Sequence, residues 1–492
     1  MTGNEHAGRT ESIAVPTIES RSIDFIPLNE RHGKVWHQGP FWFMGNANLT
    51  TAFAGVIGAA LGLNLIACII AIILGSAFGT FFMAFHAVQG PRLGLPQMIQ
   101  SRVQFGARGA IVPFAAVLFI YLGFSVFNTL IAADSLGQIT APHPSLYAGV
   151  ILGFCALIAV VGYNMIHRVQ RWLSLVLLVN LLILTIAILY EVPFSNIFEV
   201  GSFSWLLFLA QFGASAGYQM AFAPYVSDYT RYLPRDTSTG AVVGWTYVGV
   251  MSSAVWLEAL GALMAVAFPR EDAVRALYSH GNAFFGGLGT VSMALAVLSF
   301  IGVTSLAIYG GMLTALSIKD AVKPSVISVR FRSMTTVSVA CVAYLIILWL
   351  PEDYLNSFGN FLTLLLYFLV PWTAVNLVDF YLVRRERYAI SEILAPNAGV
   401  YGRWGREGLI SYAVGFIAMI PFFSTAMYTG PVAHALKDAD VSFLIGLPVA
   451  ALCYYLLMRK FDLTPEMTLV EAEERRNAAD SNSRLAEDTT RA

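Results

Sequence analysis

The stretch GYQMAFAPYVSDYTRYLP, residues 217–234, closes an apolar run that begins near Trp205 and is long enough to cross a bilayer. Within a few turns this run contains helix-breaking residues and a polar amide, namely Gly213, Gly217, Gln219 and Pro224. An unpaired backbone group in hydrocarbon costs several kcal/mol, so a broken helix is tolerated only where it faces protein or a cavity. The stretch therefore predicts an interrupted membrane helix beside an internal site.

The composition of the whole chain fits a membrane protein. Of its 492 residues, 57% are hydrophobic and only 12% are charged, about half the charged share of a typical soluble domain. The net charge of −1 gives no sign of a nucleic-acid partner. The four cysteines all lie inside apolar segments, which is typical of packing residues rather than of disulfides or metal ligands.

Apolar stretches of about twenty residues recur along the chain, and they predict an all-α polytopic membrane protein with twelve transmembrane helices. The polar ends, residues 1–38 and 461–492, are expected to be tails. The second tail is predicted to be disordered, because its final part EAEERRNAADSNSRLAEDTTRA, residues 471–492, is charged and lacks aromatic residues. The expected spans are residues 41–62, 63–88, 109–137, 146–163, 169–190, 204–227, 240–268, 283–317, 334–350, 355–383, 408–429 and 441–458.

The distribution of positive charge predicts the orientation in the membrane. With twelve spans and a cytoplasmic N-terminus, the inside segments are both tails and the loops after even-numbered spans. All but three of the 29 Lys and Arg residues lie in those segments or, for Arg171, within three residues of one, the exceptions being Arg270, Arg275 and Lys437. This bias follows the positive-inside rule, so we expect a multi-pass protein of the cell membrane with both termini in the cytoplasm.

The first span carries a second set of helix-interrupting residues. Its sequence FWFMGNANLTTAFAGVIGAALGL, residues 41–63, places Gly45, Asn46 and Asn48 in its first third. Taken alone, such residues often serve helix packing or bond a neighbouring helix. Interrupted segments five spans apart indicate a transporter site between two inverted repeats. The expected arrangement is one five-helix repeat over 39–200, a second over 201–390, and two further helices over 391–460.

Four long motifs make the sequence similar to a known family. They are AFAPYVSDYTRYLP (221–234), GPRLGLPQMIQSRVQFGARGA (90–110), LLLYFLVPWTAVNLVDFYLVRRERYAI (364–390) and the terminal YGRWGREGLISYAVGFIAMIPFF with YTGPVAHALKDADVSFLIGLPVAALCYYL. They resemble the purine-cytosine permease group of the nucleobase:cation symporter-1 family. The resemblance implies the amino-acid/sodium-symporter-like fold. It also implies uptake of a nucleobase or related heterocycle, such as cytosine, a purine, allantoin or a hydantoin, coupled to H⁺ or Na⁺ without a resident cofactor.

A flat heterocycle needs an aromatic face and amide-type partners for its ring edge. The family usually has Gly-Trp where this chain has Gly123-Phe124, and the resemblance makes Phe124 the stacking candidate, although a core or lipid-facing role is open. The other substrate candidates are polar or small residues of spans 1, 3, 6 and 8. They are Asn46, Asn128, Gly217, Tyr218, Gln219 and Thr304, with a plain helix–helix hydrogen bond as the alternative for Gln219. Residues 217–219 match the position of the unwound turn that the resemblance implies for span 6.

The coupling ion is predicted from the polar residues near the two interruptions. In span 8 the family register puts Gly302 and Val303 where sodium-driven members have hydroxyls, so we expect proton coupling and keep sodium as the alternative. A buried glutamate, Glu258 in span 7, is a candidate proton carrier, with a structural role as the other interpretation. The full set of cation or proton candidates is Gly45, Asn48, Glu258, Thr304 and Ser305.

Three residues are candidates for a gate. Asp228 and Arg231 stand among tyrosines at the end of span 6, where they fit either an interfacial belt or a cytoplasmic latch. Pro371 is expected to break span 10 and to give a flexible segment. A channel or a membrane enzyme fits less well, because neither a repeated filter nor a cluster with metal-ligand spacing is found. The same scaffold could instead carry an amino acid or a thiamine-like compound.

Overall fold

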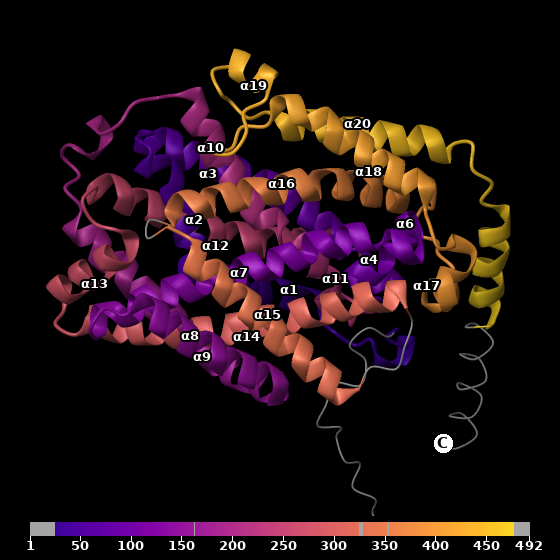
Figure 1. The fold of residues 1–492 in the computed structure, drawn as a ribbon, viewed down its shortest axis with the longest axis horizontal. Helices are drawn as coiled ribbons and strands as arrows, with labels where there is room; N and C mark the ends of the chain where they lie inside the picture. The colour runs from indigo at the N-terminus through magenta and orange to yellow at the C-terminus, as the bar shows by residue number, and fades with distance from the viewer. Residues whose placement is uncertain (1–24, 162, 324–327, 352–353, 477–492) are drawn as a thin grey trace, which may run out of the picture.

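The computed structural model of the protein describes residues 25–161, 163–323, 328–351 and 354–476. These residues form an all-α structure in which extended pairing is limited to two isolated bridges, Leu63 with Ser202 and Ser424 with Thr429. Most of the long helices run along the longest axis of the molecule (Figure 1). Seven helices within the described ranges are long and apolar enough to cross a membrane, which confirms a multi-pass helical protein.

Each of the twelve predicted ranges contains a helix, whereas the number of membrane crossings stays a prediction. The first and sixth ranges are each divided into short helices. The helices of the other ten ranges are α3 (Leu65–Ala87), α7 (Ile111–Ile139), α8 (Pro144–Val161), α9 (Tyr163–Glu191), α12 (Thr239–Ala267), α14 (Leu288–Val322), α15 (Val329–Trp349), α16 (Leu355–Val378), α18 (Arg406–Met419) and α20 (Ser442–Met458).

The range 408–429 is longer than the helix it contains. Helix α18 ends at Met419, and a short 3-10 turn, Ile420–Phe422, follows it. Pro421 lies in that turn and has no backbone N–H to continue the α-helical ladder, which explains the early end. The chain then forms a surface loop that contains the five-residue helix α19 (Pro431–Ala435).

The helix contacts in the interior are close because glycines and alanines line them. Helix α2 (Leu49–Ala60) packs against α12, α10 (Trp205–Met220) packs against α3, and α7 packs against α14. At the first crossing, a Cβ atom added to Gly55 would lie 1.9 Å from the backbone oxygen of Glu258, and one added to Gly261 would lie 1.9 Å from that of Ala52. Only glycine allows two helix backbones to approach this closely.

One end of the molecule, here called the terminal face, collects the short helices of the connecting loops. It is formed by α4 (Gln89–Leu93), α6 (Arg102–Gly109), α11 (Val226–Thr230), α17 (Ile390–Leu394) and residues 464–476, and it lies at the right of Figure 1. The other end, here called the opposite face, carries α13 (Ala273–Phe284), at the left of Figure 1.

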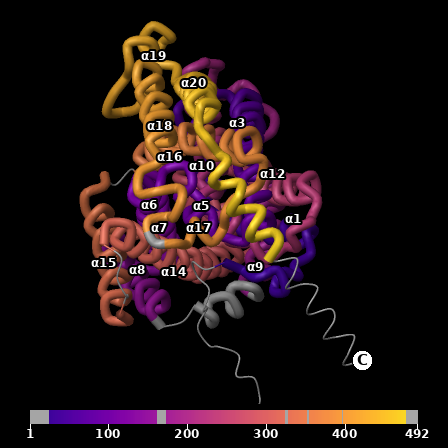
Figure 2. Tube along the Cα trace, turned by 90° about the vertical axis from the view of Figure 1, so that its right-hand side faces the viewer, coloured from indigo at the N-terminus to yellow at the C-terminus, as the bar shows by residue number. Residues whose placement is uncertain are grey.

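Part of the tail expected to be disordered is an ordered helix. Residues 464–476 are helical and lie across the terminal face, in yellow in Figure 2. Glu466 accepts from the Nε atom of Arg384 at 2.9 Å, and the Glu473 carboxylate accepts from the backbone N–H of Ile390 at 3.0 Å. The acidic side chains that suggested disorder are therefore binding partners of the loop before α17. Residues 477–492 lie outside the described part of the chain.

Candidate functional site

The first span is interrupted between α1 (Gln38–Asn46) and α2, as the sequence predicts. Asn48 fixes the interruption, because its Oδ1 atom accepts from the backbone N–H of Thr50 at 2.9 Å and of Thr51 at 3.3 Å. Its Nδ2 atom donates to the carbonyl of Gly45 at 3.3 Å. Asn48 is thus the N-cap of α2, the role that this side chain performs best at a helix start.

The sixth span is also interrupted, but at a different place from the one predicted. Helix α10 continues through Gly217, Tyr218 and Gln219 and ends at Met220, and the 3-10 turn η4 (Ala223–Tyr225) and α11 follow. The expected unwinding at 217–219 is therefore wrong. Gly217 serves a close helix contact instead, since an added Cβ would lie 2.1 Å from the backbone oxygen of Leu362 on α16.

An aromatic pair lies between the two interrupted helices. The ring of Phe124 on α7 meets that of Tyr218 on α10 edge to face, with centroids 5.6 Å apart and planes at 81°. Phe361 on α16 contacts Phe124 in the same geometry at 5.4 Å. The Tyr218 hydroxyl lies 2.9 Å from the Thr51 Oγ1 atom, which ties the pair to the start of α2. Aromatic rings pair with other planar rings in edge-to-face or offset-stacked geometry, so this pair offers suitable partners for a planar ligand.

Asn128 completes this group on the side of α7. It lies one turn along α7 from Phe124, and its Oδ1 atom accepts a hydrogen bond of 2.6 Å from the Thr50 hydroxyl. We call Thr50, Thr51, Phe124, Asn128 and Tyr218 the break cluster. It combines aromatic faces with an amide and hydroxyls, so it can both stack on a heterocycle and bond its edge.

Thr50 and Thr51 were not selected from the sequence as site residues, although their position after Asn48 indicates them. They directly follow an N-cap asparagine, so they occupy the first turn of the second half-helix. The first turn of a helix that starts inside a membrane must face protein or a site. The capping rule applied to Asn48 would have identified both threonines.

Gln219 points away from the break cluster. Its Nε2 atom donates to the Oε1 atom of Glu258 on α12 at 2.9 Å, and the Ser76 hydroxyl of α3 donates to the same oxygen at 3.2 Å. All three side chains are buried. The alternative interpretation of Gln219 as a hydrogen-bonding partner between helices is the one that the structure displays.

The substrate candidate Asn46 and the two cation candidates of span 8, Thr304 and Ser305, lie in two other places. Asn46 donates from Nδ2 to the carbonyl of Val250 on α12 at 3.3 Å, so it fastens the end of α1 to that helix. Thr304 and Ser305 are buried in α14, and the Ser305 hydroxyl donates back to the carbonyl of Ile301 at 2.6 Å. Neither span 8 residue has a recorded hydrogen bond to the break cluster, and their cation role stays a prediction.

The gate candidates lie at or near the terminal face. The Asp228 carboxylate accepts from the backbone N–H of Gln97 at 2.9 Å, and the Arg231 Nε atom donates to the backbone carbonyl of Asp228 at 3.2 Å. The first bond holds α11 against the segment that follows α3, and the second closes the end of α11 itself. Pro371 does not break its helix: α16 runs continuously through it to Val378, followed by a π-helical turn, Asp379–Val383.

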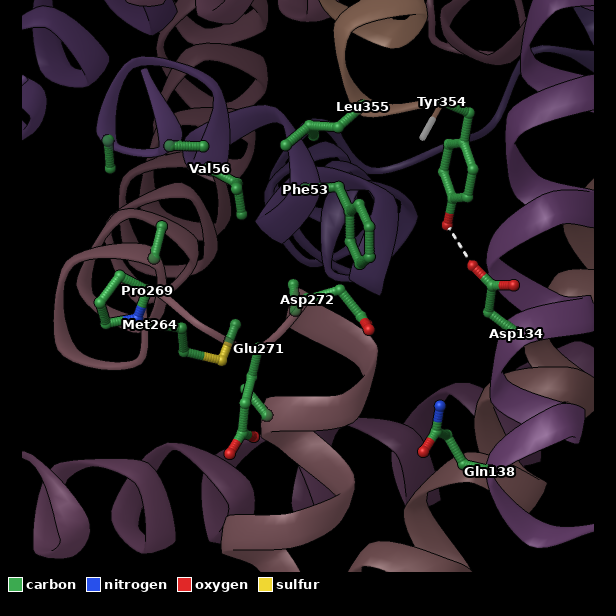
Figure 3. Close-up of a pocket in the computed structure, with 15 residues that line it drawn as sticks. Phe53, Val56, Asp134, Gln138, Met264, Pro269, Glu271, Asp272, Tyr354 and Leu355 are labelled. Carbon is green, nitrogen blue, oxygen red and sulfur yellow. Dashed lines mark hydrogen bonds between the residues drawn. The ribbon is translucent and has the colours of Figure 1, made fainter. Parts of the chain in front are cut away.

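A cavity of about 530 Å³ opens on the opposite face. Figure 3 shows Phe53 of α2 and Asp134 of α7 on its wall, with the Tyr354 hydroxyl donating to the Asp134 carboxylate at 2.7 Å. Phe53 is three residues after Thr50, and Asp134 is six residues after Asn128. Because both helices continue into the break cluster, the cavity approaches that cluster along α2 and α7. Its other charged lining residues are Glu271 and Asp272.

Comparison with known sequences identifies the family. The family model for permeases for cytosine/purines, uracil, thiamine and allantoin matches residues 25–446. The Bacillus subtilis (strain 168) protein YxlA is 35% identical over 446 residues, which cover 90% of this chain and 96% of that protein. The purine-cytosine permease fcyB of Emericella nidulans is 24% identical over 91% of this chain and 89% of its own length.

Solved structures agree on the fold. The inward-facing conformation of Mhp1 has a TM-score of 0.75 at 18% identity and covers 90% of this chain and 94% of its own. A closed conformation of Mhp1 with bromovinylhydantoin bound has a TM-score of 0.69 at 19% identity, covering 89% of this chain and 95% of that one. The family suggested by the four motifs is therefore confirmed: the chain belongs to the purine-cytosine permease group of the nucleobase:cation symporter-1 family and is a membrane transporter, not an enzyme.

Proposed function

We propose that this permease imports a nucleobase or related heterocycle across the cell membrane by symport with protons, through alternating access. The observation that carries the proposal is the break cluster, in which an aromatic pair and an amide lie between two interrupted helices. Relatives are named as purine-cytosine permeases, a vitamin B6 transporter and a hydantoin permease. All of these names refer to planar nitrogen heterocycles, which supports the same substrate class here.

The capping of α2 favours a neutral heterocycle over an amino acid. In inverted-repeat symporters an α-carboxylate is met by the free N-terminus of a half-helix. Here the Asn48 side chain already accepts from the N–H groups of Thr50 and Thr51 at the start of α2. A carboxylate would have to displace that cap, whereas a ring could bind beside it. An amino acid or a thiamine-like compound remains the second candidate substrate.

The helix contacts support two inverted five-helix repeats followed by two further helices. If spans 1 to 5 repeat as spans 6 to 10, the contact of span 1 with span 7 should return as one of span 6 with span 2. Helix α2 belongs to span 1 and packs against α12, which is span 7. Helix α10 belongs to span 6 and packs against α3, which is span 2, so both expected contacts are present. Likewise, the contact of span 4 (α8) with span 8 (α14) is matched by the contact of span 9 (α15) with span 3 (α7). The positive-inside bias supports cytoplasmic termini, so the cavity in Figure 3 would face outward.

Binding measurements on the purified protein test the substrate assignment. Cytosine, adenine, hypoxanthine, uracil, allantoin, hydantoin and a thiamine-like compound would each be added during thermal unfolding, and a bound ligand should raise the Tm. Phe124→Ala and Asn128→Ala should each weaken binding of the stabilising compound at least tenfold, because each removes a stacking or edge contact. Phe368→Ala, which removes an aromatic ring of α16 outside the break cluster, is the control. Undiminished affinity in both cluster variants would reject the site.

Uptake into proteoliposomes tests the coupling ion. Replacing sodium with choline should leave uptake unchanged, and a protonophore should abolish accumulation. The reverse pair of results would refute proton coupling and favour sodium symport on the same scaffold.

A further inference from the structure

The side chain of Glu258 lies in the interior of the helix bundle, where it has no exposed surface. It projects from α12 toward α3 and α10. Its Oε1 atom accepts from the Gln219 amide at 2.9 Å and from the Ser76 hydroxyl at 3.2 Å, and the Ser215 hydroxyl of α10 is a further polar neighbour. All of these neighbours are neutral.

Glu258 has no cationic partner among the described residues. From α3 it faces Ser76, and from α10 it faces Ser215, Gln219 and the titratable phenol of Tyr218. Helix α2 presents its backbone at Gly55, with no side chain in between. The contacts that hold α1 on α12 lie about two turns away, at the level of Val250, and α13 packs beyond the end of α12. A carboxylate ion here would be an uncompensated charge within the membrane interior, which is strongly unfavourable.

Two oxygen atoms of this group lack a donor. The Oε2 atom of Glu258 and the Oε1 atom of Gln219 are both buried without a hydrogen-bond partner. A buried acceptor without a donor is unfavourable, because it has lost its hydrogen bonds to water and gained none in return. One proton on Oε2 would satisfy both, because a carboxylic acid and a primary amide can form a closed pair of hydrogen bonds. In that pair the amide N–H donates to one carboxyl oxygen and the carboxyl O–H donates to the amide oxygen, after small rotations of the two end groups.

We propose that Glu258 is the proton-binding carboxyl group of this transporter and that Gln219 holds it as an acid–amide pair. The inference rests on the proposed proton symport and assigns its coupling site. A proton adds to the Glu258 Oε2 atom from one side of the membrane and leaves to the other side, with no other bond made or broken.

The position of the pair explains how a proton could control the substrate site. Gln219 and Tyr218 are neighbours on α10, so one faces Glu258 while the other faces the break cluster. With the proton bound, the neutral pair fastens α10 to α12. Without it, the carboxylate needs water or another donor, and the contact between the two helices weakens. When this contact weakens, α10 can shift relative to α12 and carry Tyr218 away from Phe124. Proton occupancy of Glu258 is thereby linked to substrate affinity.

Glu258→Gln tests the coupling, because it imitates the neutral acid in size but cannot release a proton. In proteoliposomes the variant should bind the nucleobase and exchange it across the membrane in counterflow. A pH gradient should no longer drive accumulation, which should fall to the level seen without a gradient. The control is Glu199→Gln, an exposed glutamate on the opposite face, which should accumulate substrate like the wild type. Gradient-driven accumulation that survives in Glu258→Gln would overturn the assignment.

Infrared spectroscopy tests the protonated carboxyl group without transport. The wild type should show the C=O stretch of a buried carboxylic acid, Glu258→Asp should shift this band, and Glu258→Gln should remove it. A band that is unchanged in both variants would overturn the inference even if Glu258→Gln were inactive. If the wild type accumulates nucleobases without any pH gradient or membrane potential, the proposed proton coupling fails, whereas the infrared result still decides whether Glu258 holds a proton.

Discussion

Gly55→Ala should destabilise the protein by forcing α2 and α12 apart. The new Cβ atom would stand 1.9 Å from the backbone oxygen of Glu258, and real Cβ contacts are essentially never shorter than 3.0 Å. One helix must therefore move by about 1 Å at a crossing where both partners are backbone and cannot rotate away. Overpacking of this kind typically costs about 1–3 kcal/mol, and the rigid neighbour places Gly55→Ala at the upper end.

A matched substitution separates this cost from helix propensity. Gly153 lies inside α8, and an added Cβ there would meet nothing within 4 Å. Both substitutions gain the same preference of alanine for a helix, about 0.5–1 kcal/mol, so their difference isolates the steric term. The purified proteins would be heated and the remaining folded protein measured by size-exclusion chromatography. The Tm of Gly153→Ala should equal or exceed that of the wild type, and the Tm of Gly55→Ala should be well below it. A Gly55→Ala protein as stable as Gly153→Ala would refute the close crossing.

Two further predictions concern residues outside the membrane spans. Glu466→Ala should lower stability by about 1–3 kcal/mol, because Arg384 loses one charged partner and keeps Asp379; Glu471→Ala, which removes an exposed pair, should change little. Burial raises the pKa of Asp440 above its ordinary 3.8, so its folded form holds a proton more tightly than its unfolded form. Its contribution to stability is therefore complete below that ordinary value and is lost as the pH rises through the raised one. Asp440→Asn should flatten this part of the stability profile between acidic and neutral pH, and an unchanged slope would contradict it.

Much of the fold could be predicted because a bilayer imposes simple rules on sequence. Apolar runs near twenty residues located the long helices, and Asn48 marked the interruption of the first span. Unwinding was wrongly predicted at residues 217–219 because a glycine in a membrane helix can permit either unwinding or close contact with another helix. Only the distance to Leu362 on α16 shows which use applies at Gly217.

The candidate site was predicted in part. The structure brings Phe124 and Tyr218 into contact, with Asn128 one turn away on α7, whereas Gln219 faces another helix; their role in binding stays a prediction. Tyr218 and Gln219 are adjacent, so about 100° of helical rotation separates their directions. That rotation could not be assigned while the residues were expected to be unwound. The ordered part of the tail was missed for another reason: its composition suggests disorder, and its partners lie some eighty residues earlier in the chain.

The helix formed by residues 464–476 has a practical consequence for handling this transporter. It contacts two separate stretches: the loop after α11, through Arg235, and the loop between the π-helical turn and α17, through Arg384 and Arg387. A fluorescent reporter or affinity handle joined directly after residue 460 would remove the ion pairs that these three arginines form with Glu466 and Glu474. Expression vectors that place the fusion beyond residue 476 keep these ion pairs intact and suit both purification and functional work.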